Sequence, residues 1–298
     1  MTLLETVEAA ARQFEAAGLS YGHGTTNARD EAAWLVLWSL GLPLDTALDD
    51  APDSEAKRPV TPAEQAQAAT LLGARIATRK PAAYLTQEAW LQGFSFYVDE
   101  RVIVPRSLIA ELLVDGGIDY FLRESTRTVL DLCTGNGSLA IIAASVFPEV
   151  AVDAADISAD ALAVARINVD KHGLQERIRL VESDGLTALP GPYDLILCNP
   201  PYVNAQSMAA LPAEYKAEPA IALSGNQSGG TDGMDFIRTL LKQAPEHMNA
   251  SAVLVLEIGN ERPYFEAAFP TLEVVWLETS AGEDQVLLIT REALTSEN

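Results

Sequence analysis

The feature that most constrains the fold of this chain is an alternation of short, β-branched runs with longer helical patterns, which begins at residue 128. Strand patterns occupy residues 128–132, 150–155, 177–181, 193–198, 252–258, 272–277 and 285–290. Helical patterns occupy residues 138–147, 159–172 and 234–248. This alternation predicts an α/β fold whose mostly parallel sheet is covered by helices on both faces. The last two strands should form a closing antiparallel pair, and a ligand should bind at the carboxyl ends of the parallel strands.

The first 85 residues are predicted to be helical, apart from a loop rich in Pro and Asp at residues 42–60. Apolar residues recur on one helical face from Leu3 to Phe14. The stretch Thr61-Pro-Ala-Glu64 is a capping box with proline at the first helical position, so it predicts a helix that reaches about Thr78. We interpret residues 1–85 as a small helical domain that selects the substrate.

A β-hairpin is predicted over residues 86–107, between the two domains. The stretch from Phe94 to Val98 alternates, and the strand pattern of residues 102–104 follows a polar Asp-Glu-Arg tip. A helix should then open at Pro105 and reach about Ile118. We expect residues 108–298 to form the catalytic domain.

Composition argues against several classes of function. The formal net charge is −22, which opposes sequence-independent binding to nucleic acid, because such binding depends on Lys and Arg. The same charge suits a basic protein partner. The two cysteines and three histidines show no metal-ligand spacing, so no metal is expected. No apolar run approaches a membrane span, and the N-terminus lacks a basic signal region, so we expect a cytoplasmic protein without membrane contact.

A ligand loop is predicted directly after the first strand of the alternation. It begins at Asp131 and contains Gly135 and Gly137, which let the backbone turn sharply and let a ligand approach. The next helix begins at once, so its free N–H groups face the ligand. Asp156 ends the second strand, where a carboxylate can accept hydrogen bonds from both ribose hydroxyls. Asp184 follows the third strand, in a place suited to an adenine amino group.

Two nucleotide ligands fit this pattern. The stretch Gly135-x-Gly137-x-x-Ala140 with Asp156 matches a dinucleotide fingerprint, which is weak on its own. S-adenosylmethionine has no phosphate and carries an ammonium and a sulfonium. It therefore suits Asp131, which would be awkward beside a pyrophosphate. Carboxylates at three strand ends favour this cationic ligand, although each one alone is compatible with a helix or turn cap.

The stretch Asn199-Pro-Pro-Tyr202 ends the fourth strand, which should lie beside the first. Its prolines fix φ and remove two N–H donors, so the Pro200 carbonyl becomes a rigid acceptor. Together with the Asn199 side-chain oxygen, it can accept both hydrogens of a planar –NH₂ group. This raises the electron density on nitrogen and aims its lone pair at a methyl sulfonium. Tyr202 can pack against the flat amide or base. Catalysis would then be orientation and electrostatics, without a His or Cys base.

These motifs resemble those of amino-methyltransferases that carry Asn-Pro-Pro-Tyr and act on adenine N(6) or on a glutamine amide. The chain is more similar to the HemK-like protein-(glutamine-N(5)) methyltransferases, over nearly its whole length. The shared features include Lys80-Pro-Ala-Ala-Tyr-Leu85, the hairpin, the sheet, Glu218-Pro219 and Thr231-Asp-Gly233. Release-factor enzymes carry Pro-Arg-Pro after the hairpin, whereas this chain has Pro105-Arg-Ser107, which resembles the branch that modifies ribosomal protein L-3. The stretches 211–219 and 256–260 point the same way.

The resemblance implies a Rossmann-like, class I S-adenosylmethionine-dependent methyltransferase that modifies the N(5) amide of a glutamine in ribosomal protein L-3. It implies cofactor contacts from Asp131, Cys133, Thr134, Gly135, Asn136, Gly137, Asp156, Ile157, Asp184, Gly185 and Asn199. It implies substrate contacts from Asn199, Pro200, Pro201, Tyr202 and Arg106, of which Asn199, Pro200 and Tyr202 are expected to be catalytic. The alternatives are the same reaction on a peptide-release factor, DNA adenine methylation, and a non-catalytic ribosome-assembly factor.

Overall fold

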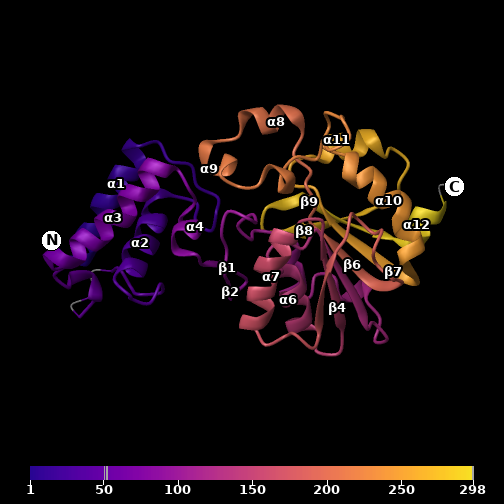
Figure 1. Cartoon of the computed structure of the whole chain (residues 1–298), viewed down its shortest axis with the longest axis horizontal. Helices are drawn as coiled ribbons and strands as arrows, with labels where there is room; N and C mark the ends of the chain where they lie inside the picture. The colour runs from indigo at the N-terminus through magenta and orange to yellow at the C-terminus, as the bar shows by residue number, and fades with distance from the viewer. Residues whose placement is uncertain (50, 52, 297–298) are drawn as a thin grey trace. The chain divides into compact units, whose positions relative to one another are not determined.

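The computed structural model describes residues 1–49, 51 and 53–296, which form two compact units (Figure 1). The helical unit comprises Met1–Ala89 and Pro212–Ala217, and the sheet unit comprises Trp90–Leu211 and Glu218–Asn298. The chain therefore passes between the units three times. The sequence predicted a single domain for residues 108–298, whereas residues 212–217 pack with the helical unit in the structure. Long-range ion pairs described below account for this packing.

The helical unit is built around α1, α2 and α3. Its elements are α1 (Leu3–Ala16), α2 (Ala28–Ser39), a 3₁₀ turn (Glu55–Lys57), α3 (Pro62–Thr78), α4 (Ala82–Thr86) and α9 (Ala213–Lys216). Leu3, Phe14 and Leu35 are fully buried in its core. The capping box of α3 is confirmed, because the Thr61 hydroxyl accepts from the Glu64 N–H and the Glu64 carboxylate accepts from the Thr61 N–H at 2.8 Å. In the part of the chain that the structure describes, no helix is long and apolar enough to cross a membrane.

The sheet unit contains a seven-stranded sheet, and the predicted α/β class is confirmed. In spatial order the strands are β5 (Ile178–Glu182), β4 (Ala151–Asp156), β3 (Thr128–Leu132), β6 (Tyr193–Cys198), β7 (Met248–Glu257), β9 (Gly282–Thr290) and β8 (Val275–Thr279). The first five strands are parallel, and β9 runs antiparallel to both of its neighbours. The fourth strand of the sequence pattern does pair with the first, in the register Leu132↔Cys198. This pairing brings the glycine loop and Asn199 to the same edge of the sheet.

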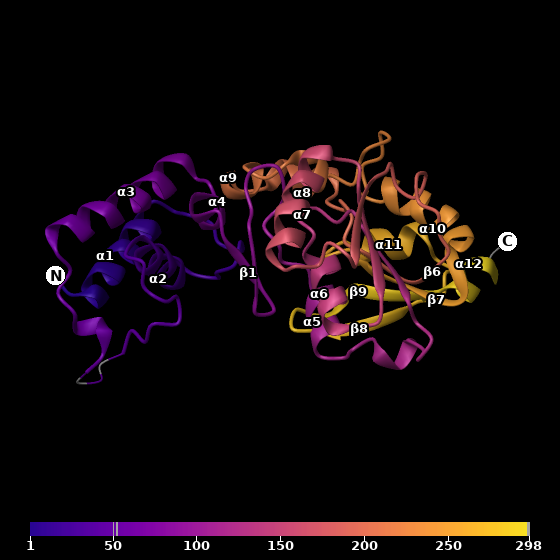
Figure 2. The same ribbon diagram turned by 60° about the horizontal axis from the view of Figure 1, so that its bottom comes forward.

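Helices cover both faces of this sheet. On one face lie α6 (Ser138–Val146) and α7 (Ala159–Lys171), and on the other α10 (Asp235–His247) and α12 (Arg291–Ser296) (Figures 1 and 2). The remaining helical elements of the unit are α5 (Ile109–Val114), a turn (Asp119–Phe121), α8 (Ala205–Ala210), a turn (Ala220–Ala222) and α11 (Arg262–Ala268). The residues of α6 from Ser138 to Ala144 are all buried, which is typical of a helix enclosed by protein on every side.

Two local predictions were wrong. The hairpin consists of β1 (Ala89–Leu91) and β2 (Phe94–Phe96), and not of strands on either side of an Asp-Glu-Arg tip. Its two-residue turn puts Gln92 and Gly93 at φ 49° and 78°, and glutamine is not a usual residue for such a turn. The helix predicted from Pro105 to Ile118 is only α5, because the preceding residues hydrogen-bond to two buried glutamates and the left-handed Gly116 ends the helix.

Candidate active site

A cavity opens at the carboxyl ends of β3, β4 and β6, as the fold predicted. Eight of the site residues expected from the sequence line it: Cys133, Gly135, Asp156, Ile157, Asp184, Gly185, Asn199 and Pro201. Pro219, Ile221, Ala222, Gln227 and Phe236 complete much of its wall. The other expected residues, Asp131, Thr134, Asn136, Gly137, Pro200, Tyr202 and Arg106, are not among the lining residues. Several of them hold the lining residues in place.

The loop after β3 enters the cavity through three left-handed residues. Cys133, Gly135 and Gly137 have φ of 62°, 56° and 84°. A β-carbon at Gly137 would lie 3.3 Å from the Ala165 side chain, so glycine lets the loop pack against α7. Cys133 is not a glycine, and a residue held at positive φ beside a cavity is a form of backbone strain found at functional sites.

Asp156 ends β4 and fixes the glycine loop from within the cavity. One carboxylate oxygen accepts from the Gly135 N–H at 2.9 Å, and the other accepts from the Ser158 N–H at 2.9 Å. A carboxylate has about four acceptor sites, so Asp156 can also accept from a ligand hydroxyl. Burial raises the pKa of Asp156 above its usual value.

Replacement of Asp156 by alanine should weaken the binding of the nucleotide ligand. Loss of two charge-assisted hydrogen bonds predicts a rise in the dissociation constant of S-adenosylmethionine of at least about tenfold, measured by calorimetry. Asp153→Ala provides the control, because it removes a carboxylate from the same strand but not from the cavity. Equal affinity for the Asp156→Ala variant and the control would exclude the ligand role of Asp156.

Asp131 holds the loop in its conformation and is only 1% exposed. Its Oδ2 accepts from the Thr134 hydroxyl at 2.5 Å and from the Ala140 N–H at 2.9 Å, which ties the loop to the first turn of α6. Its Oδ1 is buried and has no hydrogen-bond partner among the described residues. Burial raises the pKa of Asp131 to about 7. An ammonium group is the kind of partner that an orphaned carboxylate oxygen suits.

The Asn-Pro-Pro-Tyr stretch lies where β6 ends. Asn199 and Pro201 line the cavity, and Pro200 between them is buried. No described residue forms a hydrogen bond with the Asn199 side-chain amide, so its donor and acceptor groups remain available to a ligand.

Two glycines from distant parts of the chain hold Tyr202. A β-carbon at Gly233 would lie 2.1 Å from the Tyr202 carbonyl oxygen. A β-carbon at Gly259 would lie 2.7 Å from Cε2 and 3.0 Å from the hydroxyl of Tyr202. Both positions therefore require glycine, which lets the backbone pass directly over this residue. The sequence resemblance included both glycines but gave no physical role for either.

Gly259→Ala should displace the tyrosine ring and lower turnover. The added methyl group would occupy space that the ring fills, so we expect kcat to fall by about tenfold or more, because small misplacements of orienting groups are costly. Gly173→Ala tests whether backbone strain alone has this effect. Gly173 has φ 68°, and its β-carbon would meet nothing within 4 Å. If both variants lose turnover equally, the packing of Tyr202 is not the cause.

Three buried glutamates support this region, and the sequence patterns did not single out their roles. Glu261 accepts from the Asn204 side-chain amide with both carboxylate oxygens at 2.8 Å. Glu218 forms a two-pronged ion pair with Arg106, at 2.7 Å for each contact. Arg106, which the resemblance placed at the substrate, therefore has an acidic partner within the sheet unit. Glu257 accepts from the Ser107 hydroxyl at 2.6 Å.

Glu257 should make the stability of the sheet unit depend on pH. Burial raises its pKa from 4.5 to about 7, so the protonated form is favoured in the folded state. The associated stability is present at low pH and is lost as the pH rises through about 7. In the unaltered protein, the titration of Glu257 should lower the free energy of unfolding by on the order of 2 kcal/mol between pH 5 and pH 7. Glu257→Gln should abolish this decrease. Denaturant titrations at both pH values test this, with the exposed Glu278→Gln as a control that keeps the pH dependence.

Two ionisable side chains of this region, Cys133 and Tyr202, remain neutral. The Cys198 thiol and burial hold the pKa of Cys133 well above its usual value. Burial and the Glu257 carboxylate raise the pKa of Tyr202. Neither side chain is suited to remove a proton near neutral pH. The site therefore offers fixed polar groups rather than a strong base.

Comparisons with known proteins point to methyltransferases. The family model described as "Methyltransferase small domain" matches residues 111–215. The chain is 51% identical over 298 residues to the ribosomal protein uL3 glutamine methyltransferase of Bordetella pertussis, covering 99% of this chain and 97% of that protein. It is 48% identical over 299 residues to the protein of the same name from Neisseria meningitidis serogroup A, covering 99% and 95%.

Solved structures show a shared fold at low sequence identity. The hMettl16 catalytic domain, in complex with the MAT2A 3'UTR hairpin 6, superimposes with a TM-score of 0.51 and 15% identity. The match covers 76% of this chain and 81% of that one. At this identity the likeness concerns the fold alone.

Proposed function

This chain belongs to the ribosomal protein uL3 glutamine methyltransferase family, and we propose that it methylates the side-chain amide nitrogen of a glutamine in ribosomal protein uL3, also called L-3. The methyl donor is S-adenosylmethionine. One observation carries the proposal: Asn199 and Pro201 line the same cavity as Asp156 and the glycine loop. A group that can hold an amide thus shares a cavity with groups that suit a nucleoside.

The lining residues fit S-adenosylmethionine. Ile157, Ile221 and Phe236 supply apolar walls for a base, and Asp156 supplies acceptors for the ribose hydroxyls. The loop from Cys133 to Gly137, with the orphaned Asp131 oxygen behind it, suits the cationic amino-acid end. When bound, this cofactor supplies an electrophilic methyl group on a sulfonium sulfur.

Asn199 and the Pro200 carbonyl hold and orient the substrate amide. Both hydrogens of the –NH₂ group donate to these fixed acceptors, which orients the nitrogen lone pair and makes the nitrogen more electron-rich. After transfer, the methylated nitrogen loses one proton to water, so no side chain has to act as a strong base. The neutral Tyr202 follows the lining residue Pro201 and is held next to this wall by Gly233 and Gly259. Catalysis is then positioning together with electrostatic complementarity.

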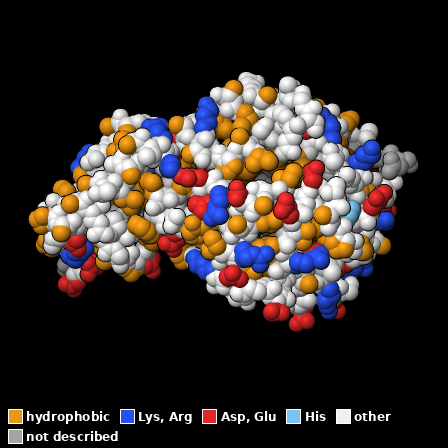
Figure 3. Space-filling model, viewed as in Figure 1, with side chains coloured by type: hydrophobic (Ala, Val, Ile, Leu, Met, Phe, Trp, Pro, Cys, Tyr) orange, Lys and Arg blue, Asp and Glu red, His pale blue; other side chains and the backbone are white. Residues whose placement is uncertain are grey.

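The distribution of charge supports a basic protein as the partner. Residues 90–211 and 218–298 contain 29 Asp and Glu against 12 Lys and Arg, so most of the acidic excess lies in the sheet unit. On the face shown in Figure 3, the Lys and Arg side chains are scattered among acidic ones and form no continuous basic stripe. Such a surface speeds the encounter with a basic protein and disfavours nucleic acid. We expect uL3 to be met as the free protein or as an early assembly intermediate.

A substrate-exchange assay tests this function. The protein is incubated with methyl-labelled cofactor and with purified uL3, a peptide-release factor or duplex DNA in separate reactions. We expect label only in uL3. Label in the release factor alone would keep the chemistry and overturn the substrate, whereas label in DNA adenine would overturn both. No label in any of them would favour a non-catalytic role.

A further inference from the structure

Residues 205–217, which we call the strap, connect two walls of the candidate active site. Residues 199–202 precede it with only Val203 and Asn204 between them, and Pro219 and Ile221 follow it and line the cavity. Between these walls, Pro212–Ala217 leaves the sheet unit and packs with the helical unit. A change in how this short segment packs with the helical unit will therefore affect the residues at both walls, because the chain connects them directly.

The two ends of the strap are fixed in the sheet unit. Asn204, just before it, is held by Glu261 through its side-chain amide at 2.8 Å. Glu218, just after it, accepts from Arg106 and also from the Val104 N–H at 2.9 Å. The strap is thus a loop that is anchored at both ends in the sheet unit.

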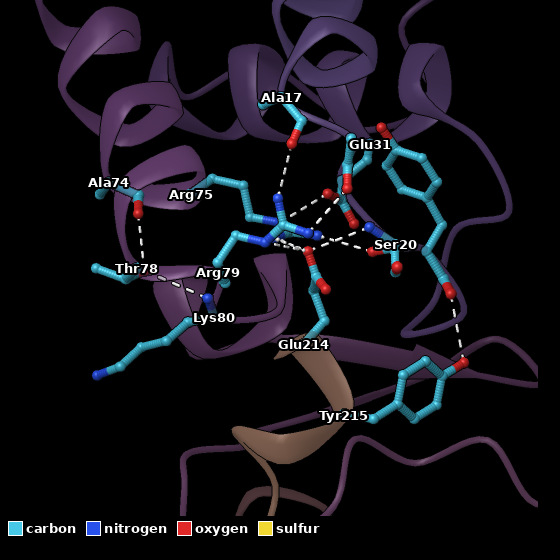
Figure 4. Close-up of polar contacts among 12 residues, drawn as sticks. Ala17, Ser20, Glu31, Ala74, Arg75, Thr78, Arg79, Lys80, Glu214 and Tyr215 are labelled. Carbon is cyan, nitrogen blue, oxygen red and sulfur yellow. Dashed lines mark hydrogen bonds and ion pairs between the residues drawn. The ribbon is translucent and has the colours of Figure 1, made fainter. Parts of the chain in front are cut away.

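The middle of the strap packs into a polar site of the helical unit that is centred on Glu214 (Figure 4). We call this site the seat of the strap. The Glu214 side chain is 0% exposed, and so is that of its partner Arg75. One carboxylate oxygen of Glu214 lies 2.9 Å from Arg79 Nε, and it accepts from Arg75 Nη1 at 3.4 Å and from the Ser20 N–H at 3.1 Å. Arg75 also pairs with the buried Glu31 at 2.8 Å. Removal of the Glu214 carboxylate would take away one of the two buried carboxylates that pair with Arg75.

A second side chain fits the same unit independently of charge. The Tyr215 ring lies 4.3 Å, centroid to centroid, from the ring of His23, and its hydroxyl donates to the Tyr21 carbonyl at 3.3 Å. A β-carbon at Gly22 would lie 2.1 Å from that hydroxyl. Gly22 has φ +123° and provides the space that the tyrosine occupies. The seat is therefore specific for this segment in both charge and shape.

We propose that Glu214 and Tyr215 are positioning residues for methyl transfer: their seat in the helical unit fixes the strap and thereby the cavity walls on either side of it. The inference rests on the proposed function, and it ties turnover to a part of the chain that contains none of the site residues. A released strap moves between its two anchored ends, and residues 199–202 next to it are then held less firmly.

The first test is Glu214→Gln, with Glu15→Gln as the control because Glu15 is an exposed glutamate of the same unit. Measurements are kcat and KM for uL3, cofactor affinity, and hydrogen exchange over residues 203–211 and 218–224. We expect kcat/KM to fall by at least about tenfold, with cofactor affinity within about threefold and faster exchange in both segments. Unchanged kcat/KM, or a loss of kcat/KM without faster exchange in those segments, overturns the proposal.

The second test avoids a buried charge and thus a variant that fails to fold. Gly22→Ala places a methyl group against the Tyr215 hydroxyl, and Tyr215→Phe removes that hydroxyl. We expect Gly22→Ala to lower kcat/KM and the double variant Gly22→Ala/Tyr215→Phe to recover most of it. Both variants carry the same strained backbone at residue 22, so recovery can come only from relief of the clash. Absence of recovery overturns the role of this seat.

These outcomes separate the inference from the proposed function. If the unaltered protein modifies no glutamine in uL3, the proposed function fails, whatever the variants do. If the unaltered protein modifies uL3 and the strap variants do so equally well, only the positioning role fails.

Discussion

Asn199→Ala should lower kcat by about 100-fold or more, which corresponds to about 3 kcal/mol of lost transition-state stabilisation, with little change in cofactor affinity. The reason is that the Asn199 side chain lines the cavity and has no hydrogen-bond partner among the described residues, so its amide is free to orient the substrate. The cofactor would still be held by Asp156 and the glycine loop. Steady-state rates with uL3 and calorimetry with S-adenosylmethionine measure the two quantities separately.

A matched control is Asn249→Ala. Asn249 lies near the start of β7, at the opposite end of the strands from the cavity, and its side chain donates to Asp194 at 2.7 Å. We expect nearly normal turnover in this control. If Asn199→Ala weakens cofactor binding as much as it lowers kcat, Asn199 belongs to the cofactor site rather than to substrate orientation.

Arg75→Met should destabilise the helical unit by about 3–5 kcal/mol, the cost typical of breaking a buried ion pair from one side. The substitution keeps the apolar stem but leaves Glu31 and Glu214 buried without the guanidinium between them. Burial raises the pKa of Glu31 even with Arg75 in place, and the side chains of both residues are at most 1% exposed. Hydrogen exchange of the amides in α2 and α3 measures the loss for this unit alone.

Arg29→Met removes the same kind of side chain from an exposed ion pair. Arg29 contacts Glu8 at 3.1 Å, and both side chains are largely exposed to solvent. Such surface pairs contribute about 1 kcal/mol or less, so this control should change exchange only slightly. Equal effects of the two substitutions would mean that the buried cluster does not stabilise the helical unit.

Local patterns in the sequence were enough to predict the sheet and the cavity. The strands β3 and β6 occur with the predicted bounds because each is a compact apolar run with turn residues or charges at its ends. Their pairing follows from the topology of parallel sheets, and it brings Asn199 to the cavity that contains Asp156. This part of the site therefore follows from the order of strands and helices along the chain.

Long-range contacts could not be inferred in the same way. The pairing of Glu214 with Arg75 joins residues 139 positions apart, and no local periodicity reports it. One signal was present: Arg75 interrupts the apolar face of α3, and a charge at a core position needs a partner. The turn at Gln92 likewise depends on a left-handed glutamine, which composition does not indicate.

The most direct test of the central claim is peptide mass spectrometry of uL3 after incubation with this protein and S-adenosylmethionine, with the Asn199→Ala variant alongside. We expect one added methyl group on the side-chain amide of a single glutamine, formed by the unaltered protein and nearly absent with the variant. A methyl group on any other kind of side chain, or equal modification by the variant, would contradict this claim.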